Sequence, residues 1–80
     1  MSTINEKNLQ PHEQRVVVEL KELTERREKL ATFIAGKMFA EVPTDEQARL
    51  QRQFHIMVQY EGVLQERIDH FPAVKGVGRG

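Results

Sequence analysis

The amino-acid sequence predicts an all-α fold: an antiparallel two-helix hairpin that assembles with further copies of itself into a homo-oligomeric helical bundle. Two mostly apolar stripes advance by alternating steps of four and three residues, the spacing of a helix seam. When the chain folds back on itself, the residue numbers of facing members have a nearly constant sum, as an antiparallel pair requires. The stripes consist of Val16, Leu20, Leu23, Arg27, Leu30, Ile34 and Lys37, and of Leu50, Phe54, Met57, Glu61, Leu64, Ile68 and Phe71.

Each stripe is interrupted near its middle by one charged residue, Arg27 in the first and Glu61 in the second. The fold-back places these two opposite charges against each other. We interpret them as an ion pair, within or beside the seam, that sets the register of the two helices. The alternative, in which Arg27 holds a charged ligand, stays open at this point.

The first helix is expected to span residues from about 11 to 36 or 40. Pro11 suits the first turn of a helix, where its missing N–H is no loss. Gly36 weakens the helix near its end. Residues 1–9 are polar and show no period, so we expect a flexible N-terminus.

A turn is expected at about residues 41–43, next to Pro43. Thr44 is expected to cap the second helix, and Gln47 to complete a capping box three residues later. The second helix should then span about 44–71 and end before a proline. Together these elements make residues 10–71 one helical hairpin.

Residues 72–80 contain three glycines and two basic residues, and we expect them to form a flexible basic tail. The chain as a whole carries 12 basic and 12 acidic side chains, and this balance disfavours binding to duplex nucleic acid. It contains no cysteine, which suits a reducing cytoplasm. No apolar run approaches the ~20 residues of a membrane span, so a soluble intracellular protein is expected.

A hairpin of two helices buries one stripe on each helix, yet further apolar residues remain. In the second helix Ile56, Tyr60 and Val63 recur at helical spacing, about 100° from the seam. Further helices packed against this surface would cover it, and 80 residues offer a small core, so we predict a homo-oligomer. Gly62 costs a helix about 1 kcal/mol relative to alanine, which favours close approach of another backbone there.

The sequence shows no catalytic motif, no glycine-rich phosphate loop and no metal-ligand spacing among its histidines, His12, His55 and His70. We therefore predict a protein that is not an enzyme, with no cofactor and no metal site.

Several side chains instead suit a small anionic ligand that carries a planar ring. An aromatic side chain can stack on a base, and the planar fork of an arginine matches phosphate oxygens. The alternative interpretation is that Tyr60 packs at an interface and that Arg67 forms a surface ion pair. The candidate ligand-binding residues are Tyr60, Arg67, His70, Arg27, Lys75 and Arg79.

A further set of residues lies between positions 19 and 68: Glu22-Leu23, Lys29-Leu30, Phe33-Ile34, Phe39, Leu50, Gln53, Met57, Tyr60, Leu64 and Arg67-Ile68. With these residues the chain resembles a family of small helical-hairpin proteins encoded by crAss-like and many other tailed phages. Such proteins are similar to phage anti-CBASS and anti-Thoeris sponges, which oligomerise and sequester cyclic nucleotides or cyclic ADP-ribose derivatives. The resemblance implies capture of such a messenger in the host bacterial cytoplasm without turnover. The alternative is a helical adaptor that docks a host or phage protein.

Overall fold

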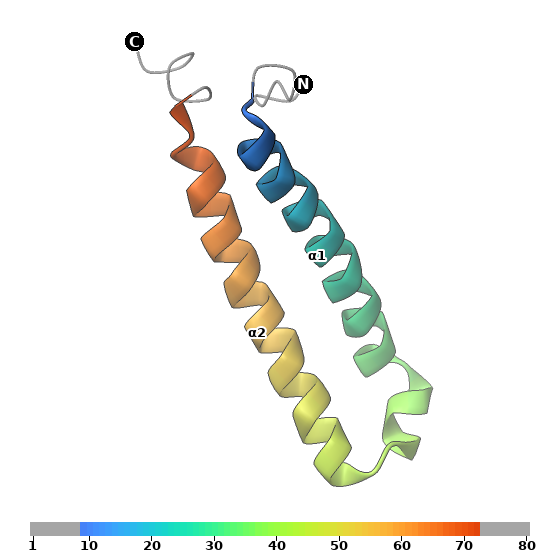
Figure 1. Cartoon of the computed structure of the whole chain (residues 1–80). Coiled ribbons are helices and arrows are strands. Elements are labelled where there is room, and N and C mark those ends of the chain that lie inside the picture. Colours follow the sequence, from blue (N-terminus) through green and yellow to red (C-terminus); the bar gives the residue numbers. More distant parts are fainter. Residues whose placement is uncertain (1–8, 73–80) are drawn as a thin grey trace.

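Two long helices lie side by side and run in opposite directions (Figure 1). This computed structural model describes residues 9–72. Helix α1 spans Pro11–Ala35, the short 3-10 helix η2 spans Lys37–Glu41, and helix α2 spans Thr44–Asp69. Residues 9–72 contain no strand, so the predicted all-helical hairpin is confirmed. Most of the predicted flexible ends, residues 1–9 and 72–80, lies outside the described part of the chain. Leu9 is described and is buried in the core at 5% exposure, so the prediction of a flexible end is wrong at that residue.

The hydrophobic core is the predicted seam between α1 and α2. The core is fully buried toward the end of the hairpin where α1 begins and α2 finishes, and Leu64 is its most enclosed side chain, at 0% exposure. Toward the turn the facing residues, such as Leu30 and Phe54, are only half-buried. The buried apolar residues are Leu9, Val16, Leu23, Leu64, Ile68 and Phe71.

Lys37 is an exception to the predicted seam. It is exposed, because α1 ends at Ala35 and Lys37 is the first residue of η2. The helical phase that would have carried Lys37 onto the seam is therefore broken at Gly36, whose N–H bonds the carbonyl of Phe33 at 3.1 Å.

A polar cluster spans the middle of the seam. The Arg27 guanidinium donates through Nε to Glu61 Oε1, so the predicted ion pair is confirmed. The second carboxylate oxygen of Glu61 accepts a hydrogen bond from the Thr24 hydroxyl at 2.5 Å. The side chains of Arg27 and Glu61 are 26% and 16% exposed, which places the pair at the border of the core. Both oxygens of Glu61 are thus bound by α1.

The start of α2 differs from the prediction. Pro43 occupies the N-cap position and Thr44 is the first helical residue, so the prediction that Thr44 caps the helix is wrong. The predicted capping role of Gln47 is replaced by a different one. Its side-chain amide donates to the carbonyls of Phe39 and Val42, at 3.0 and 2.8 Å. This fastens the end of η2 to the first turn of α2.

At its other end α2 finishes at Asp69, two residues before the predicted boundary. The N–H of His70 bonds the carbonyls of Glu66 and Arg67, each at 3.2 Å, and closes the last turn. Phe71 packs into the core from outside the helix. Within α2, a Cβ placed on Gly62 would meet no atom within 4 Å, so packing inside the hairpin does not require glycine there.

The described hairpin is thin, at 52 × 20 × 19 Å. Neither of its long helices carries a stretch apolar and long enough to traverse a bilayer.

Candidate ligand-binding face

The exposed side of the hairpin that carries Tyr60 combines apolar, aromatic and charged groups. We call it the Tyr60 face and define it by Glu19 of α1 and Ile56, Tyr60, Val63 and Arg67 of α2. The three apolar or aromatic members are 55%, 41% and 51% exposed in chain order. Their spacing of four, three and four residues keeps the α2 members on one side of that helix.

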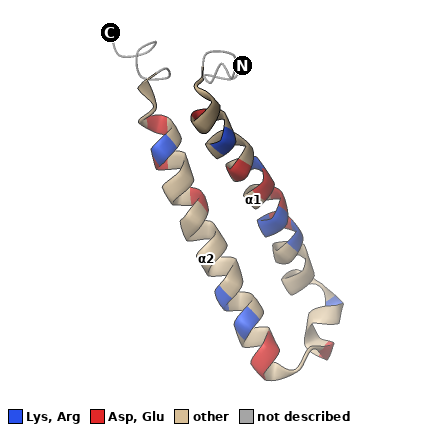
Figure 2. Ribbon diagram, in the orientation of Figure 1, with Lys and Arg blue, Asp and Glu red and all other residues tan. Residues whose placement is uncertain are grey.

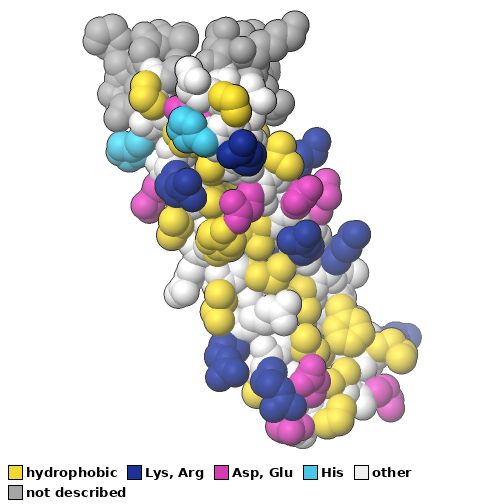
Figure 3. Space-filling view, in the orientation of Figure 1, with side chains coloured by type: hydrophobic (Ala, Val, Ile, Leu, Met, Phe, Trp, Pro, Cys, Tyr) yellow, Lys and Arg dark blue, Asp and Glu magenta, His cyan; other side chains and the backbone are white. Residues whose placement is uncertain are grey.

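Charge is distributed unevenly between the two helices. Figure 2 shows charged residues along much of α1 and a long uncharged stretch in the middle of α2, where residues 53–60 contain no Lys, Arg, Asp or Glu. The space-filling view shows hydrophobic side chains running down the visible side of the molecule (Figure 3). Histidine and basic side chains gather near one end of this run, beside acidic ones. An apolar surface thus adjoins a charged one.

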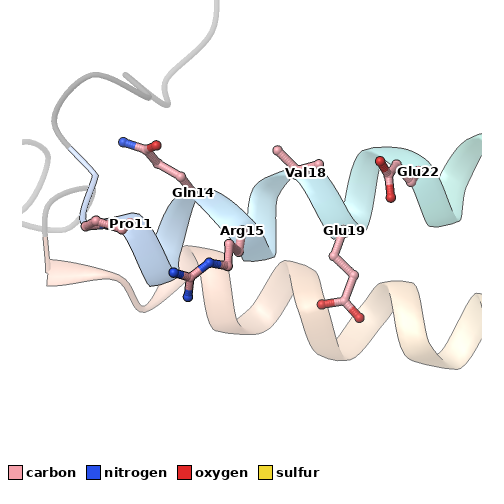
Figure 4. Close-up of a pocket in the computed structure, with 6 residues that line it drawn as sticks. All are labelled: Pro11, Gln14, Arg15, Val18, Glu19 and Glu22. Carbon is pink, nitrogen blue, oxygen red and sulfur yellow. The ribbon is translucent and has the colours of Figure 1, made fainter.

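A hydrogen bond across the two helices organises the Tyr60 face. The Tyr60 hydroxyl of α2 donates to Glu19 Oε2 of α1. Glu19 also lines a shallow groove on α1 (Figure 4), in which Arg15 and Glu19 extend to the side where α2 lies, whereas Val18 points away. The phenol is therefore held by a carboxylate, and an arginine lies one turn before that carboxylate.

This hydrogen bond changes the acidity of the phenol. The Glu19 carboxylate raises the pKa of Tyr60 above its usual value, mainly by accepting the hydroxyl proton in a hydrogen bond. Partial burial and the negative charge of Glu19 act in the same direction, while the positive charge of Arg67 opposes them. This opposing effect is that of a cation on the same side of α2 as the phenol.

Substitution of Glu19 by glutamine is expected to lower the pKa of Tyr60 toward its usual value of about 10. The chain contains one tyrosine and no tryptophan, so the ultraviolet absorbance of tyrosinate reports this residue alone. Because the folded-state pKa is raised, the stabilisation from this contact is present below the unfolded-state pKa and is lost as pH rises through the folded-state value. Glu22→Gln is the control, since Glu22 lines the same groove without bonding Tyr60. Equal titration midpoints in the wild type and in Glu19→Gln would contradict the contact.

The structure brings together some of the predicted site residues. Arg67 is exposed in the last turn of α2, seven residues after Tyr60 and on the same side of the helix. His70 is exposed at the C-cap, with Nδ1 2.7 Å from the carbonyl oxygen of Glu66. Arg27 is engaged with Glu61 in the seam, which supports the register role over the ligand role. The predicted positions Lys75 and Arg79 lie outside the described residues.

Two residues of this region were missed by sequence reasoning, Glu19 and Arg15. Both lie on the flank of α1 that the antiparallel arrangement turns toward the Tyr60 side of α2. The sequence could have indicated them, because the predicted seam also determines which side of α1 lies next to the Tyr60 side of α2. Within residues 9–72, no group of three His, Asp or Glu side chains is placed to hold a metal ion.

Comparison with known proteins gives one family. The family model described as Sequestin matches residues 10–70, which include both long helices and every residue of the Tyr60 face. Neither the search of curated proteins nor that of solved structures found a match. Since the matched region covers most of the 80 residues, the chain belongs to the Sequestin family, in agreement with the predicted resemblance to sequestering phage hairpins.

Proposed function

We propose that the protein is a phage sponge that binds a cyclic nucleotide or cyclic ADP-ribose-type messenger of bacterial antiphage defence and holds it without cleaving it. The observation that carries the proposal is the Tyr60 face, where an exposed aromatic ring shares one side of α2 with the exposed Arg67. The ring offers a stacking surface for a base, and the guanidinium offers a bidentate partner for phosphate. The family name Sequestin also fits capture of a partner.

In this proposal the site is completed by a second copy of the chain in a homo-oligomer. The Tyr60 face is open in a single hairpin, and small-molecule sites usually bury most of their ligand. Ile56 and Val63 flank Tyr60 and are more than half exposed, so a second copy over them would remove apolar surface from water. The ligand would then lie between subunits, in the host bacterial cytoplasm.

A thermal-shift screen of cyclic dinucleotides, cyclic trinucleotides and cyclic ADP-ribose isomers tests the proposal. A ligand present at about 100 times its Kd should stabilise the native state by about 2.7 kcal/mol. Heat denaturation of the complex should release the ligand chemically intact, because sequestration requires no turnover. Absence of stabilisation by every ligand, or recovery of cleaved products, would refute this function.

Within the same experiment Arg67→Ala should weaken binding by at least about tenfold while leaving helicity unchanged, because it removes a charge-assisted contact from an exposed position. Arg49→Ala is the matched control. Arg49 lies in α2 but forms ion pairs with Asp45 and Glu46, in the first turn of that helix. Equal affinity of both variants would remove Arg67 from the site.

The exposed apolar side chains of Ile56 and Val63 also favour a second candidate, a helical adaptor that docks a host or phage protein. In that case protein purified from infected cells should carry a stoichiometric protein partner, and heating should release no nucleotide.

A further inference from the structure

Helix α2 carries a second stripe with the spacing of a helix seam, on the side opposite its core residues. Two residues correspond to about 200° of helix rotation, so Gln59 lies opposite Met57 of the seam. Ile56 and Val63 are 55% and 51% exposed, although both are large and apolar. We call this set the α2 outer stripe. Its members, all exposed and separated by alternating steps of four and three, are Arg52, Ile56, Gln59, Val63 and Glu66.

The α2 outer stripe has opposite charges at equal distances from its centre. Arg52 and Glu66 each lie seven residues from Gln59, or about 10 Å along the helix. Within residues 9–72 neither side chain forms an ion pair or a side-chain hydrogen bond. A second α2 packed antiparallel about Gln59 would place Arg52 opposite Glu66 of the partner subunit, at both ends. A parallel pair would place like charges together, so charge complementarity selects the antiparallel arrangement.

The glycine inside α2 fits the same arrangement. Gly62 is exposed and borders the α2 outer stripe, and a Cβ there would meet no atom of the hairpin within 4 Å. Glycine lowers helix stability relative to alanine, and packing within the hairpin gives no reason for it. Gly62 follows Gln59 by three residues and Ile56 precedes it by three. Antiparallel pairing therefore brings Ile56 of the partner subunit to the glycine, where the missing side chain leaves room for it.

We propose that the α2 outer stripe is a self-association surface, on which a second copy of the chain docks by antiparallel packing of α2 on α2, with a two-fold axis at Gln59. Each copy then removes Ile56 and Val63 from water. The two Gln59 amides face each other and can exchange hydrogen bonds. The more charged helix α1 stays on the outside of the pair (Figure 2). This inference rests on the homo-oligomer of the proposed function and specifies which surfaces meet.

Cysteine cross-linking tests the position of the two-fold axis. The chain contains no cysteine, so each single-cysteine variant reports one position. Gln59→Cys should give a disulfide-linked dimer on mild oxidation, because the axis brings its two copies to the Cα separation of about 4.4–6.8 Å that a disulfide spans. Ala48→Cys is the matched control, at another exposed position on the same side of α2. Antiparallel packing separates its two copies by about 33 Å, so it should not cross-link. Non-reducing electrophoresis measures both.

Charge reversal tests the direction of packing. Arg52→Glu should weaken the dimer by about tenfold in Kd, because each end then pairs two carboxylates, and Glu66→Arg should do the same. The variant with both changes should return to within about threefold of the wild type, since opposite charges meet again. Glu25→Arg, at an exposed position of α1, should leave the Kd unchanged. Sedimentation velocity measures the Kd, and circular dichroism confirms that each variant is helical.

Several results would overturn the inference. The wild type would sediment as a monomer across the concentrations used in the thermal-shift screen, or Gln59→Cys would fail to cross-link. Cross-linking of Ala48→Cys as readily as Gln59→Cys would show parallel packing, and reversals at both charged positions without effect on the Kd would exclude this surface. None of these measurements reports messenger binding, so the thermal-shift screen decides the sponge function separately.

Discussion

Leu64→Ala is expected to lower the free energy of unfolding by about 2–5 kcal/mol, the range measured for removal of a large buried aliphatic side chain. Leu64 is 0% exposed and belongs to the cluster that includes Leu23 and Ile68. Truncation removes apolar area from that cluster and leaves a cavity. The effect is large relative to the whole, because a domain this small rarely gains more than about 3–5 kcal/mol from a single core.

Urea denaturation followed by circular dichroism measures the change, at a fixed protein concentration because oligomers couple stability to concentration. Val58→Ala is the control: Val58 lies on the same helix, is 44% exposed, and should change stability by no more than about 0.5 kcal/mol. Similar losses in the two variants would show that the seam is not the core.

The seam could be predicted from the sequence because two independent regularities agree. The helical period identifies one apolar side on each helix, and the mirrored order of the stripes fixes direction and register. The contact between Arg27 and Glu61 confirms that register directly. Lys37 shows where periodicity stops being informative: it continues the spacing of the first stripe, but the helix has already ended at Ala35. The helical period predicts which side chains are buried only for residues that belong to the helix.

The turn was predicted less well, because several local arrangements satisfy the same backbone groups. The pattern of Thr44 and Gln47 has the spacing of a capping box, yet the side chain of Gln47 bonds carbonyls of the preceding segment instead. The positions of these carbonyl groups depend on the path of η2, and that path depends on how the chain leaves α1. Residue types and spacing do not determine that path, so the cap was assigned one residue too late.

For the candidate site, the sequence-based prediction grouped residues of one helix and did not extend the grouping across both helices. Tyr60 and Arg67 share a side of α2 because they are seven residues apart, and this was predictable. Glu19 was missed because its link to Tyr60 depends on the register and on which flanks meet, and no spacing within one helix encodes that. From the sequence, Arg27 could either form an ion pair at the seam or bind a charged ligand. Its contact with Glu61 supports the ion pair.

Removal of either partner of the Arg27–Glu61 pair is expected to destabilise the hairpin by about 1–3 kcal/mol, less than for a fully buried pair. Both side chains retain some exposure, at 26% and 16%, so water partly replaces the lost partner. Arg27→Ala leaves the Glu61 carboxylate with only the Thr24 hydroxyl as a donor. Glu61→Ala leaves both the guanidinium and that hydroxyl without their cross-helix acceptor, so it should cost more than Arg27→Ala.

A double-mutant cycle of Arg27→Ala and Glu61→Ala, measured by urea denaturation, separates the pair from its surroundings. The double variant should be less destabilised than the sum of the single variants, by about 0.5–3 kcal/mol, because the second substitution removes a group that the first has left unpaired. The charge-swapped variant with Arg27→Glu and Glu61→Arg should recover part of the stability, since the opposite signs still face each other. Strict additivity would mean that the two charges do not interact, and the antiparallel register would then rest on the apolar seam alone.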